Sequence, residues 1–163
     1  MSATLFVDEL REFIKKENLT LDQIYNADET GLFWRLLPNR ILVCGDEAHA
    51  DELAKERLTV LGCANAAGTH KCELLVIGKS AHPRAFKNVN HLPVTYKANK
   101  RAWVTQDIFL NWFNNNFATE ERNHCKKMGL GDNCKILLLL DNCPAHPDDE
   151  RLFKKRNIIV KYL

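Results

Sequence analysis

The 163-residue chain contains no long apolar run and no C-x-x-C pair of cysteines. A membrane-spanning helix needs about 20 consecutive apolar residues, and no stretch approaches that length. A secretory signal needs a basic start and an apolar middle, whereas the N-terminal segment includes Asp8, Glu9 and Glu12. These absences lead us to expect an intracellular protein with no membrane partner.

The six cysteines are scattered along the chain rather than grouped. Zinc sites and disulfide frameworks in small proteins use closely and regularly spaced cysteines. Buried free thiols are therefore the expectation at all six positions. The positions are Cys44, Cys63, Cys72, Cys125, Cys134 and Cys143.

Glycine and proline are also scarce, at seven and five residues, while 45% of the residues are apolar. This composition excludes collagen-like and disordered chains. The length suits one domain with a sizeable core. Apolar residues recur at steps of three and four over residues 3–17, which predicts a helix. We expect an N-terminal helix within residues 1–17, followed by a single domain at residues 18–163.

The net charge is only +2, but it is unevenly distributed. Residues 1–81 carry 9 Lys/Arg against 13 Asp/Glu, whereas residues 82–163 carry 14 against 8. No acid occurs between Glu73 and Asp107. Such a block is typical of a surface that binds DNA through its phosphates, although a solvated loop explains it equally well. Its basic residues are Lys79, Arg84, Lys87, Lys97, Lys100 and Arg101.

Residues 78–101, which hold these cations, are rich in Lys, Asn and Pro and have little periodicity, so they predict a long loop or extended arm. Phe86, Tyr96 and Trp103 lie in or beside it. Such side chains can stack on bases, but anchoring the arm to the core is the simpler interpretation.

Three apolar segments predict strands, at residues 24–34, 58–65 and 72–77. The link AAGTH between the last two is short enough for a hairpin. We therefore expect a three-stranded antiparallel meander with Asp28 in the middle of its first strand. A short strand at residues 40–44 and a polar loop or short helix at 45–55 are also expected.

The second half of the chain alternates helices and strands. Thr105 is placed to cap a helix whose apolar face includes Trp112 and Phe117. The polar residues 114–134 predict the end of that helix and a loop. Pro147 followed by three acids predicts another helix, and a last strand begins at Ile158.

Five consecutive apolar residues, Ile136–Leu140, run into Asp141 and stop at turn residues. A short apolar run bounded in this way predicts a strand buried on both faces. Asp141 would then lie at the carboxyl edge of a parallel sheet, where open α/β sheets carry their chemistry. Simple capping of the following turn is the alternative role.

Three antiparallel strands, a helix, a buried strand, a helix and a further strand form the element order of an α/β, ribonuclease H-like fold. In such a mixed sheet the Asp141 strand can lie beside the Asp28 strand, although 141 − 28 = 113 residues separate them. Two neighbouring carboxylates repel each other, which favours a cation between them. Mg²⁺ suits the position because it prefers oxygen ligands from one or two carboxylates, water and phosphate.

Four segments point more specifically to a family. They are IYNADETGLFW (24–34), KERLTVLGCANAAGTHKCELLVIGKSAHPRAFKN (55–88), LPVTYKANKRAWVTQDIFLNWF (92–113) and KILLLLDNCPAHP (135–147). Together they closely resemble the catalytic region of pogo/Tigger transposases and of related host proteins of the Jerky and centromere protein B type. The resemblance covers about residues 18–163.

This resemblance implies a DDE endonuclease domain, in which three acids on a ribonuclease H-like fold bind two Mg²⁺ or Mn²⁺ ions and cut and join DNA strands. Asp28 in NADET matches the first acid, and Asp141 in LLLDNCPAHP matches the second. Both are therefore expected to be catalytic metal ligands. DNA as the partner and a nuclear location are implied in the same way.

The resemblance places the third acid on a helix well beyond the second, but 163 − 141 = 22 residues follow Asp141. We therefore expect a C-terminally incomplete fold that binds its metal weakly and is inactive by itself. Two functions stay open: a partial metal-dependent DNA endonuclease or strand-transfer domain, and a non-catalytic DNA-associated module derived from one.

Two neighbours of the acids are further candidates. Glu29 adjoins Asp28, but alternation along a strand points it to the opposite face. His146 is placed to orient a phosphate or a water, although an ordinary backbone hydrogen bond explains it as well. The remaining histidines show no metal-ligand spacing. They are His49, His70, His82, His91 and His124.

Overall fold

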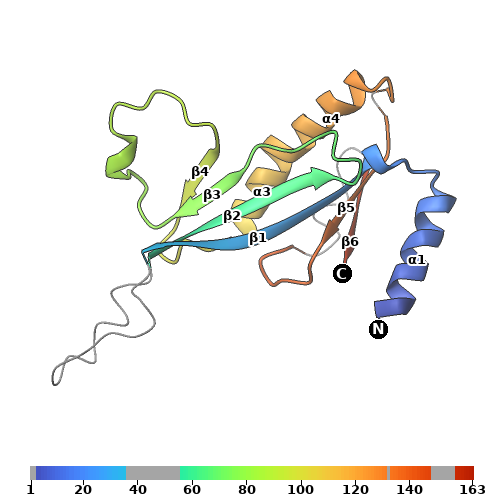
Figure 1. The fold of residues 1–163 in the computed structure, drawn as a ribbon, viewed down its shortest axis with the longest axis horizontal. Coiled ribbons are helices and arrows are strands. Elements are labelled where there is room, and N and C mark those ends of the chain that lie inside the picture. The colour runs from blue at the N-terminus through green and yellow to red at the C-terminus, as the bar shows by residue number, and fades with distance from the viewer. Residues whose placement is uncertain (1–2, 36–55, 132, 148–156) are drawn as a thin grey trace. The chain divides into compact units, whose positions relative to one another are not determined.

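The computed structural model describes residues 3–35, 56–131, 133–147 and 157–163 (Figure 1). The strand expected at 40–44, the polar segment at 45–55 and the helix expected after Pro147 lie outside the described residues. No described helix has the length and apolar character that would let it cross a membrane.

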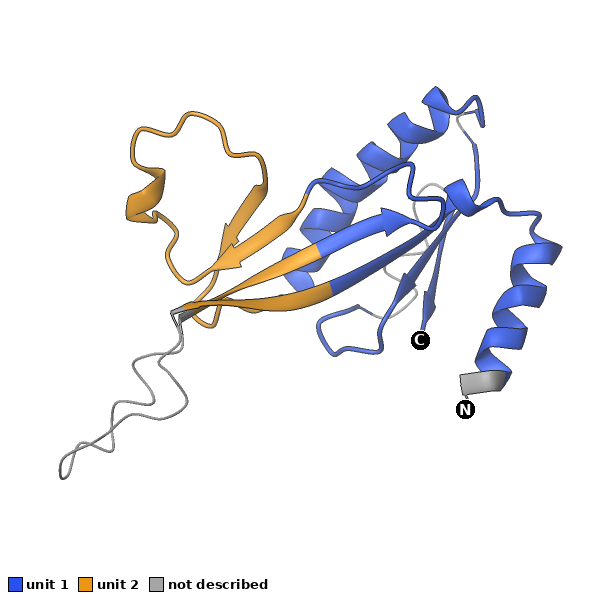
Figure 2. Cartoon of the chain, viewed as in Figure 1, with its two compact units in different colours: residues 1–28, 62–73, 105–163 blue, residues 29–61, 74–104 orange. Residues whose placement is uncertain are grey.

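Hydrogen bonding orders the strands β4-β3-β2-β1-β5-β6 in a mixed sheet. The main elements are α1 (Ala3–Lys16), β1 (Ile24–Arg35), β2 (Glu56–Asn65), β3 (Leu75–Gly78), β4 (Thr95–Ala98), α3 (Gln106–Trp112), α4 (Ala118–Lys127), β5 (Ile136–Leu140) and β6 (Ile158–Tyr162). The chain forms two compact units (Figure 2). Unit 1 comprises residues 1–28, 62–73 and 105–163, and unit 2 comprises residues 29–61 and 74–104.

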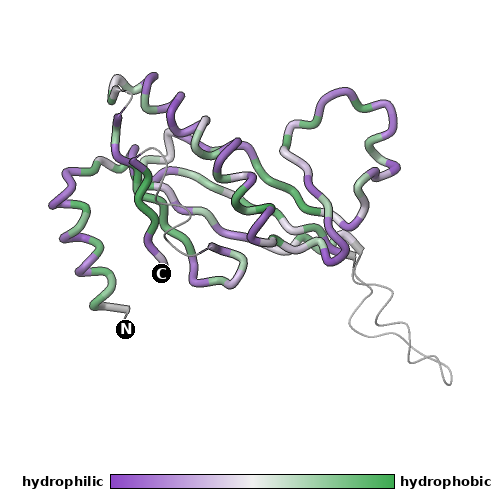
Figure 3. Tube along the Cα trace, turned by 180° about the vertical axis from the view of Figure 1, so that it is seen from behind, coloured by the Kyte–Doolittle hydropathy of each residue, from purple (hydrophilic) through white to green (hydrophobic). Residues whose placement is uncertain are grey.

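The core of unit 1 is built on β5, whose Ile136, Leu137, Leu138 and Leu140 are fully buried. Figure 3 shows this strand as a continuous hydrophobic run, as a strand covered on both faces requires. β5 pairs in parallel with both β1 and β6. The expectation of a buried parallel strand is therefore confirmed.

Helix α1 covers one face of this part of the sheet. Its Leu10, Phe13 and Ile14 pack against a cluster formed by Leu19, Ile24 and Leu137. The helix ends before Asn18, whose left-handed φ of 51° is a common way to terminate a helix. The predicted N-terminal helix is thus confirmed; the domain division at residues 17 and 18 stays a prediction.

Aromatic residues from the second half of the chain cover the other face. Tyr25, which alternation points away from Ile24, meets Phe117 edge to face with ring centroids 5.4 Å apart. Thr105 caps α3 by accepting a hydrogen bond from the backbone N–H of Ile108, as expected. A π-helical stretch, Phe113–Phe117, then joins α3 to α4 and buries both of its phenylalanines.

The expectation that the helix ends near residue 114 and gives way to a loop was wrong, because α4 continues to Lys127. Residues 118–127 are polar along most of their length, so they lack the apolar periodicity that marks a helix in sequence. A turn with positive φ at Gly129 and Gly131 then returns the chain to β5.

The structure also corrects the expectation that Cys125 and Cys134 are free thiols. A disulfide links Cys125, near the end of α4, to Cys134, just before β5. Their nine-residue separation carries no framework signal, and the helix and its turn bring them together. Cys63 and Cys72 are buried free thiols as expected, and Cys143 is free and partly buried. Cys44 lies outside the described residues.

Unit 2 holds the paired parts of β2 and β3, which run antiparallel with Leu61 opposite Leu75. The loop expected at residues 78–101 is more ordered than its composition suggests. It contains a short 3₁₀ turn at Arg84–Phe86 and the strand β4, which pairs in parallel with β3. Four residues are too few to show a periodic pattern, so the sequence did not reveal β4.

Candidate active site

The site expected from the sequence depends on the register between β1 and β5. The parallel pairs are Ile24 with Leu137, Tyr25 with Leu138 and Asn26 with Leu139. All three have the same offset of 137 − 24 = 113 residues. The pairing ends at Asn26 with Leu139. If the same offset continued for two more residues, Asp141 would lie level with Asp28, the two acids that the sequence singled out.

Two side-chain contacts hold this register. The amide of Gln23 donates a 2.8 Å hydrogen bond to the backbone oxygen of Lys135, at the start of β5. The amide of Asn26 donates a 3.3 Å bond to the backbone oxygen of Leu139. Because a slip by one residue would turn every side chain to the other face, these bonds help decide where Asp28 lies.

Alternation along β1 separates buried from exposed side chains. Tyr25 and Ala27 are buried, whereas Asn26 and Asp28 are exposed. Glu29 is partly buried, and its orientation relative to Asp28 stays a prediction. The Asp141 side chain is also accessible, with 52% of its surface exposed. Both acids are therefore accessible to solvent.

The turn after β5 fixes Asp141 through His146. The Nδ1 atom of His146 lies 2.8 Å from the backbone oxygen of Asp141 and 3.1 Å from its Oδ1. His146 is buried and packs on Phe109 with ring centroids 4.6 Å apart. The backbone oxygen of Asp141 also accepts a bond from the N–H of Cys143. The backbone of Asp141 therefore closes the following turn, and His146 makes the backbone bond that was expected of it. The Asp141 carboxylate faces His146 and solvent.

The carboxylates of Asp28 on β1 and Asp141 just after β5 offer the hard oxygen ligands that Mg²⁺ and Mn²⁺ take. Their exposure leaves room for the water and phosphate oxygens that complete the shell of such an ion. The donor set of Asp28 and Asp141 therefore fits the metal that the sequence implied.

The predicted DNA-binding residues all belong to unit 2. Lys97, on β4, is partly buried. The other five are exposed: Lys79, Arg84, Lys87, Lys100 and Arg101. The structure thus makes these cations available to a partner, and their role as DNA contacts stays a prediction.

The segment that carries these cations is held in place by contacts among its own residues. Phe86 meets Tyr96 edge to face at 4.9 Å, and the Tyr96 hydroxyl donates a 2.8 Å hydrogen bond to the backbone oxygen of Ser80. Asn99 accepts bonds from the backbone N–H groups of Arg101 and Trp103. Phe86 and Tyr96 therefore anchor the loop, whereas Trp103 is 54% exposed and stacks with Arg57 at 4.7 Å.

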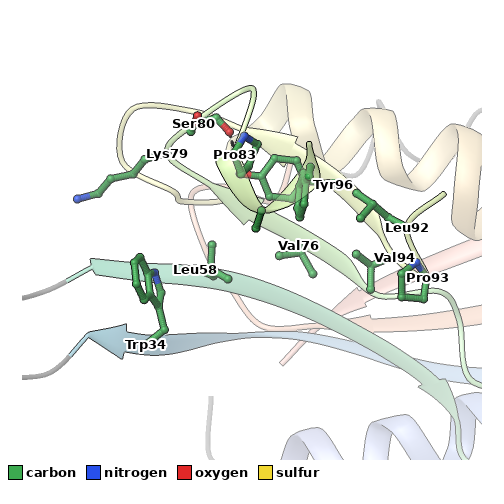
Figure 4. Close-up of a pocket in the computed structure, with 12 residues that line it drawn as sticks. Trp34, Leu58, Val76, Lys79, Ser80, Pro83, Leu92, Pro93, Val94 and Tyr96 are labelled. Atoms are coloured by element: carbon green, nitrogen blue, oxygen red, sulfur yellow. Dashed lines mark hydrogen bonds between the residues drawn. The ribbon is translucent and has the colours of Figure 1, made fainter. Parts of the chain in front are cut away.

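The same loop lines an open apolar cavity of about 650 Å³ in unit 2 (Figure 4). Its walls include Trp34, Leu58, Val76 and Tyr96, with Lys79 at its edge. Residues between 79 and 96, in the basic segment, supply most of its lining. Packing around the cavity therefore shapes the loop on which the cations lie.

Sequence reasoning missed a second group of polar side chains in unit 1. His70, Cys72 and Glu120 have potential ligand atoms within 4.8 Å of one another. Burial lowers the pKa of His70 and raises the pKa of Glu120. Residue spacing could not indicate this group, because Glu120 is far from His70 and Cys72 in the sequence.

The fold agrees with part of the fold of a transposase of known structure. The structure of a Mos1 transposase paired-end complex with the left transposon end matches with a TM-score of 0.51, at 10% identity, over 94% of this chain and 38% of that one. A pre-cleavage Mos1 transpososome matches with a TM-score of 0.54, also at 10% identity, over 94% of this chain and 39% of that one. The predicted ribonuclease H-like α/β fold is therefore confirmed.

Sequence comparison identifies the family. The model of the DDE superfamily endonuclease family matches residues 55–163, and the chain belongs to that family. The human Jerky protein homolog (Homo sapiens) is 46% identical over 99% of this chain and 29% of its own length. The Jerky protein of Mus musculus is 41% identical over the same shares.

The Tigger transposable element-derived protein 7 of Homo sapiens is 41% identical over 90% of this chain and 28% of its own length. The resemblance to Jerky and Tigger proteins is thus confirmed. The chain spans less than a third of the length of each of these relatives.

Proposed function

We propose that this chain is a DNA-binding, metal-binding part of a transposase-derived DDE endonuclease and acts in the nucleus. Asp28 and Asp141 hold a divalent ion, Mg²⁺ or Mn²⁺, and the basic loop of unit 2 contacts the DNA backbone. The observation that carries the proposal is the parallel pairing of β1 with β5 at a common offset, which would bring the two acids level if it continued to them. Membership of the DDE superfamily endonuclease family supports it.

The bound ion would supply Lewis-acid activation of the attacking oxygen and stabilisation of the leaving oxygen of a phosphodiester. The protein's own contribution is to place the two carboxylates. Asp28 follows the part of β1 that pairs with β5, and the Asp141 carboxylate is turned by its contact with His146. Such outer contacts orient a ligand and raise its affinity for metal.

The basic loop would supply affinity for DNA without reading its sequence, because contacts to phosphates are the same for every base. Five exposed cations with no acid in residues 74–106 favour a polyanion over a protein of mixed charge. One of the Mos1 transposase structures is a complex with a transposon end, which is consistent with DNA as the partner.

Mn²⁺ binding tests the metal site without requiring catalysis. Asp28→Asn and Asp141→Asn should each lower the affinity for Mn²⁺ at least tenfold, measured by electron paramagnetic resonance of the free ion. Asp8→Asn, which removes an exposed carboxylate from α1, is the control and should leave the affinity unchanged. Equal affinity in all three variants would refute the assignment of Asp28 and Asp141.

A second candidate function is a non-catalytic DNA-associated module. This function is favoured by the small number of protein ligands, Asp28 and Asp141. Two carboxylates hold Mg²⁺ weakly unless substrate phosphates complete the coordination shell of the ion. Nicking of a supercoiled plasmid with Mn²⁺ separates the two functions. Nicking that Asp141→Asn abolishes supports the endonuclease, whereas DNA binding with no nicking supports the module.

A further inference from the structure

Unit 1 contains a group of metal-ligating side chains that has no part in the site at Asp28 and Asp141. The hairpin after β2 contributes His70 and Cys72, and helix α4 contributes Glu120. A ring nitrogen, a sulfur and a carboxylate oxygen from these residues all lie within 4.8 Å of one another. Cys72 is only 5% exposed, while His70 and Glu120 are partly exposed, so an ion can reach the group from solvent.

A change of register between the two strands of the hairpin directs Cys72 toward the helix. Leu61 pairs with Leu75, but Ala64 forms a bridge with Lys71. Between these two pairs, residues 62–63 of the first strand face residues 72–74 of the second. The extra residue on the second strand makes a β-bulge. Bulges commonly re-aim a side chain next to a functional site, and here the re-aimed residue is a buried thiol.

The orientation of His70 is already fixed by its neighbours. Its Nδ1 atom lies 2.8 Å from the Tyr25 hydroxyl, which leaves Nε2 for another partner. The ring stacks on His124, with centroids 4.5 Å apart and planes 5° from parallel. Ligating histidines in metal sites are held in this way through their second nitrogen.

The carboxylate of Glu120 is held in a similar manner. Its Oε2 accepts a 2.9 Å hydrogen bond from the backbone N–H of Glu73, the residue after Cys72. This bond ties α4 to the hairpin and leaves Oε1 to bind an ion. Two of the three ligands therefore already have the supporting hydrogen bonds that a metal site needs.

We propose that His70, Cys72 and Glu120 form a zinc site that links the hairpin to α4. Sulfur and imidazole ligands select Zn²⁺ over Mg²⁺, which prefers oxygen alone. Tetrahedral Zn²⁺ with bonds of about 2.0–2.3 Å separates its ligand atoms by about 3.3–3.8 Å, so shifts of about an ångström bring the three into place. Water fills the fourth position, and the thiol proton of Cys72 passes to solvent when the ion binds.

Such an ion would reinforce the connection that the hydrogen bond from Glu73 to Glu120 already makes between the hairpin and α4. Its effect is therefore stabilisation of unit 1 rather than chemistry on DNA. The site is independent of the proposed Mg²⁺ or Mn²⁺ site, which has only oxygen ligands, so each proposal can fail without the other.

Co²⁺ titration of the chain, reduced and stripped of metal, tests this site. We expect a thiolate-to-cobalt charge-transfer band with the d–d bands of a tetrahedral ion, and displacement of both by Zn²⁺. Cys72→Ser should abolish the charge-transfer band, and Glu120→Gln should lower the affinity at least tenfold. Zn²⁺ should raise the melting temperature of the unaltered chain but not that of Cys72→Ser.

The matched control is Cys134→Ser, because Cys125 and Cys134 lie with Glu121 in another potential ligand group. This variant should keep the charge-transfer band. A band that is absent from the unaltered chain, or that survives Cys72→Ser and disappears in Cys134→Ser, would overturn the proposal. If circular dichroism shows that Cys72→Ser does not fold, His70→Gln at a partly exposed position replaces it and should lower the affinity for Co²⁺ at least tenfold; an unchanged affinity would overturn the proposal.

Discussion

The Nδ1 atom of His146 lies 3.1 Å from Oδ1 of Asp141, and it also lies 2.8 Å from the backbone oxygen of that residue. One buried imidazole therefore contacts both the main chain and the carboxylate at the end of β5. Because the imidazole packs on Phe109, one contact of this exposed carboxylate is fixed by the core. His146 is thus a positioning residue for Asp141.

His146→Ala should weaken Mn²⁺ binding about tenfold, since it removes the contact that orients the Asp141 carboxylate. It should also lower the free energy of unfolding by about 1–3 kcal/mol, because a buried hydrogen-bonded group is lost. Calorimetric titration with Mn²⁺ and urea denaturation measure the two effects. His82→Ala, at an exposed histidine, is the control. Unchanged Mn²⁺ affinity in a folded His146→Ala protein would show that His146 serves the turn alone.

Neutralising Lys97, Lys100 and Arg101 together should weaken DNA binding and flatten its dependence on salt. If all three contact phosphates, the slope of log K against log[salt] falls by about 2.7, since each contact contributes about 0.9. Fluorescence anisotropy of a labelled duplex over a range of KCl concentrations measures the slope.

A control triple variant removes three positive charges from unit 1 instead of unit 2. Lys15, Lys16 and Lys71 are exposed lysines of unit 1, and changing them to Gln should alter the slope less than the unit 2 variant does. Equal slopes for the two triple variants would mean that the effect comes from net charge. The solvated-loop interpretation would then hold for residues 97–101.

The parts of the fold that could be predicted from sequence are those with a local pattern. The apolar run of β5, the Thr105 cap and the antiparallel pairing of β2 with β3 each follow from neighbouring residues. Helix α4 was missed because its outward-facing residues are polar, and the Cys125–Cys134 disulfide was missed with it. Strand β4 is stabilised by β3 rather than by its own four residues.

The candidate site, like the fold, could be predicted only in part from the sequence. A parallel sheet implies that β1 and β5 lie together, and their pairing confirms it. The offset of that pairing is set by contacts such as Gln23 with Lys135, which no sequence pattern reveals. His70, Cys72 and Glu120 meet only because a bulge and a helix converge, so their grouping could not be predicted from spacing.

Gly78 lies where β3 passes closest to Tyr96. A Cβ at this position would collide with the Tyr96 hydroxyl and would lie 3.2 Å from Cδ2 of Leu58. Gly78→Ala should therefore cost about 1–3 kcal/mol of the free energy of unfolding. Gly31→Ala, where the nearest atom to a Cβ is 3.5 Å away, should cost less.

Tyr96→Phe provides the internal check on this contact. It removes the clashing hydroxyl together with its hydrogen bond to Ser80. If the collision is the cause, the double variant should be less destabilised than the sum of the two single variants, as measured by urea denaturation. Additive effects would show that Gly78 is needed for another reason.

The ion pair between Glu17 and Lys135 gives a pH-dependent prediction. A hydrogen bond from Nζ of Lys135, together with its charge, lowers the pKa of Glu17 below its ordinary value. A carboxylate with a lowered pKa in the folded state stabilises the protein above its unfolded pKa of about 4.3, and that contribution is lost as the pH falls through the folded value. Because Glu17 is solvent-screened, the effect on stability should be small.

NMR titration of the Glu17 carboxyl carbon measures this effect directly. Lys135→Met should return the pKa of Glu17 toward its ordinary value and make stability fall less steeply on acidification below about pH 4.5. Lys15→Met, which removes another charge near the end of α1, should change the pKa less. An ordinary pKa for Glu17 in the unaltered protein would show that Lys135 does not hold the end of α1 at the start of β5.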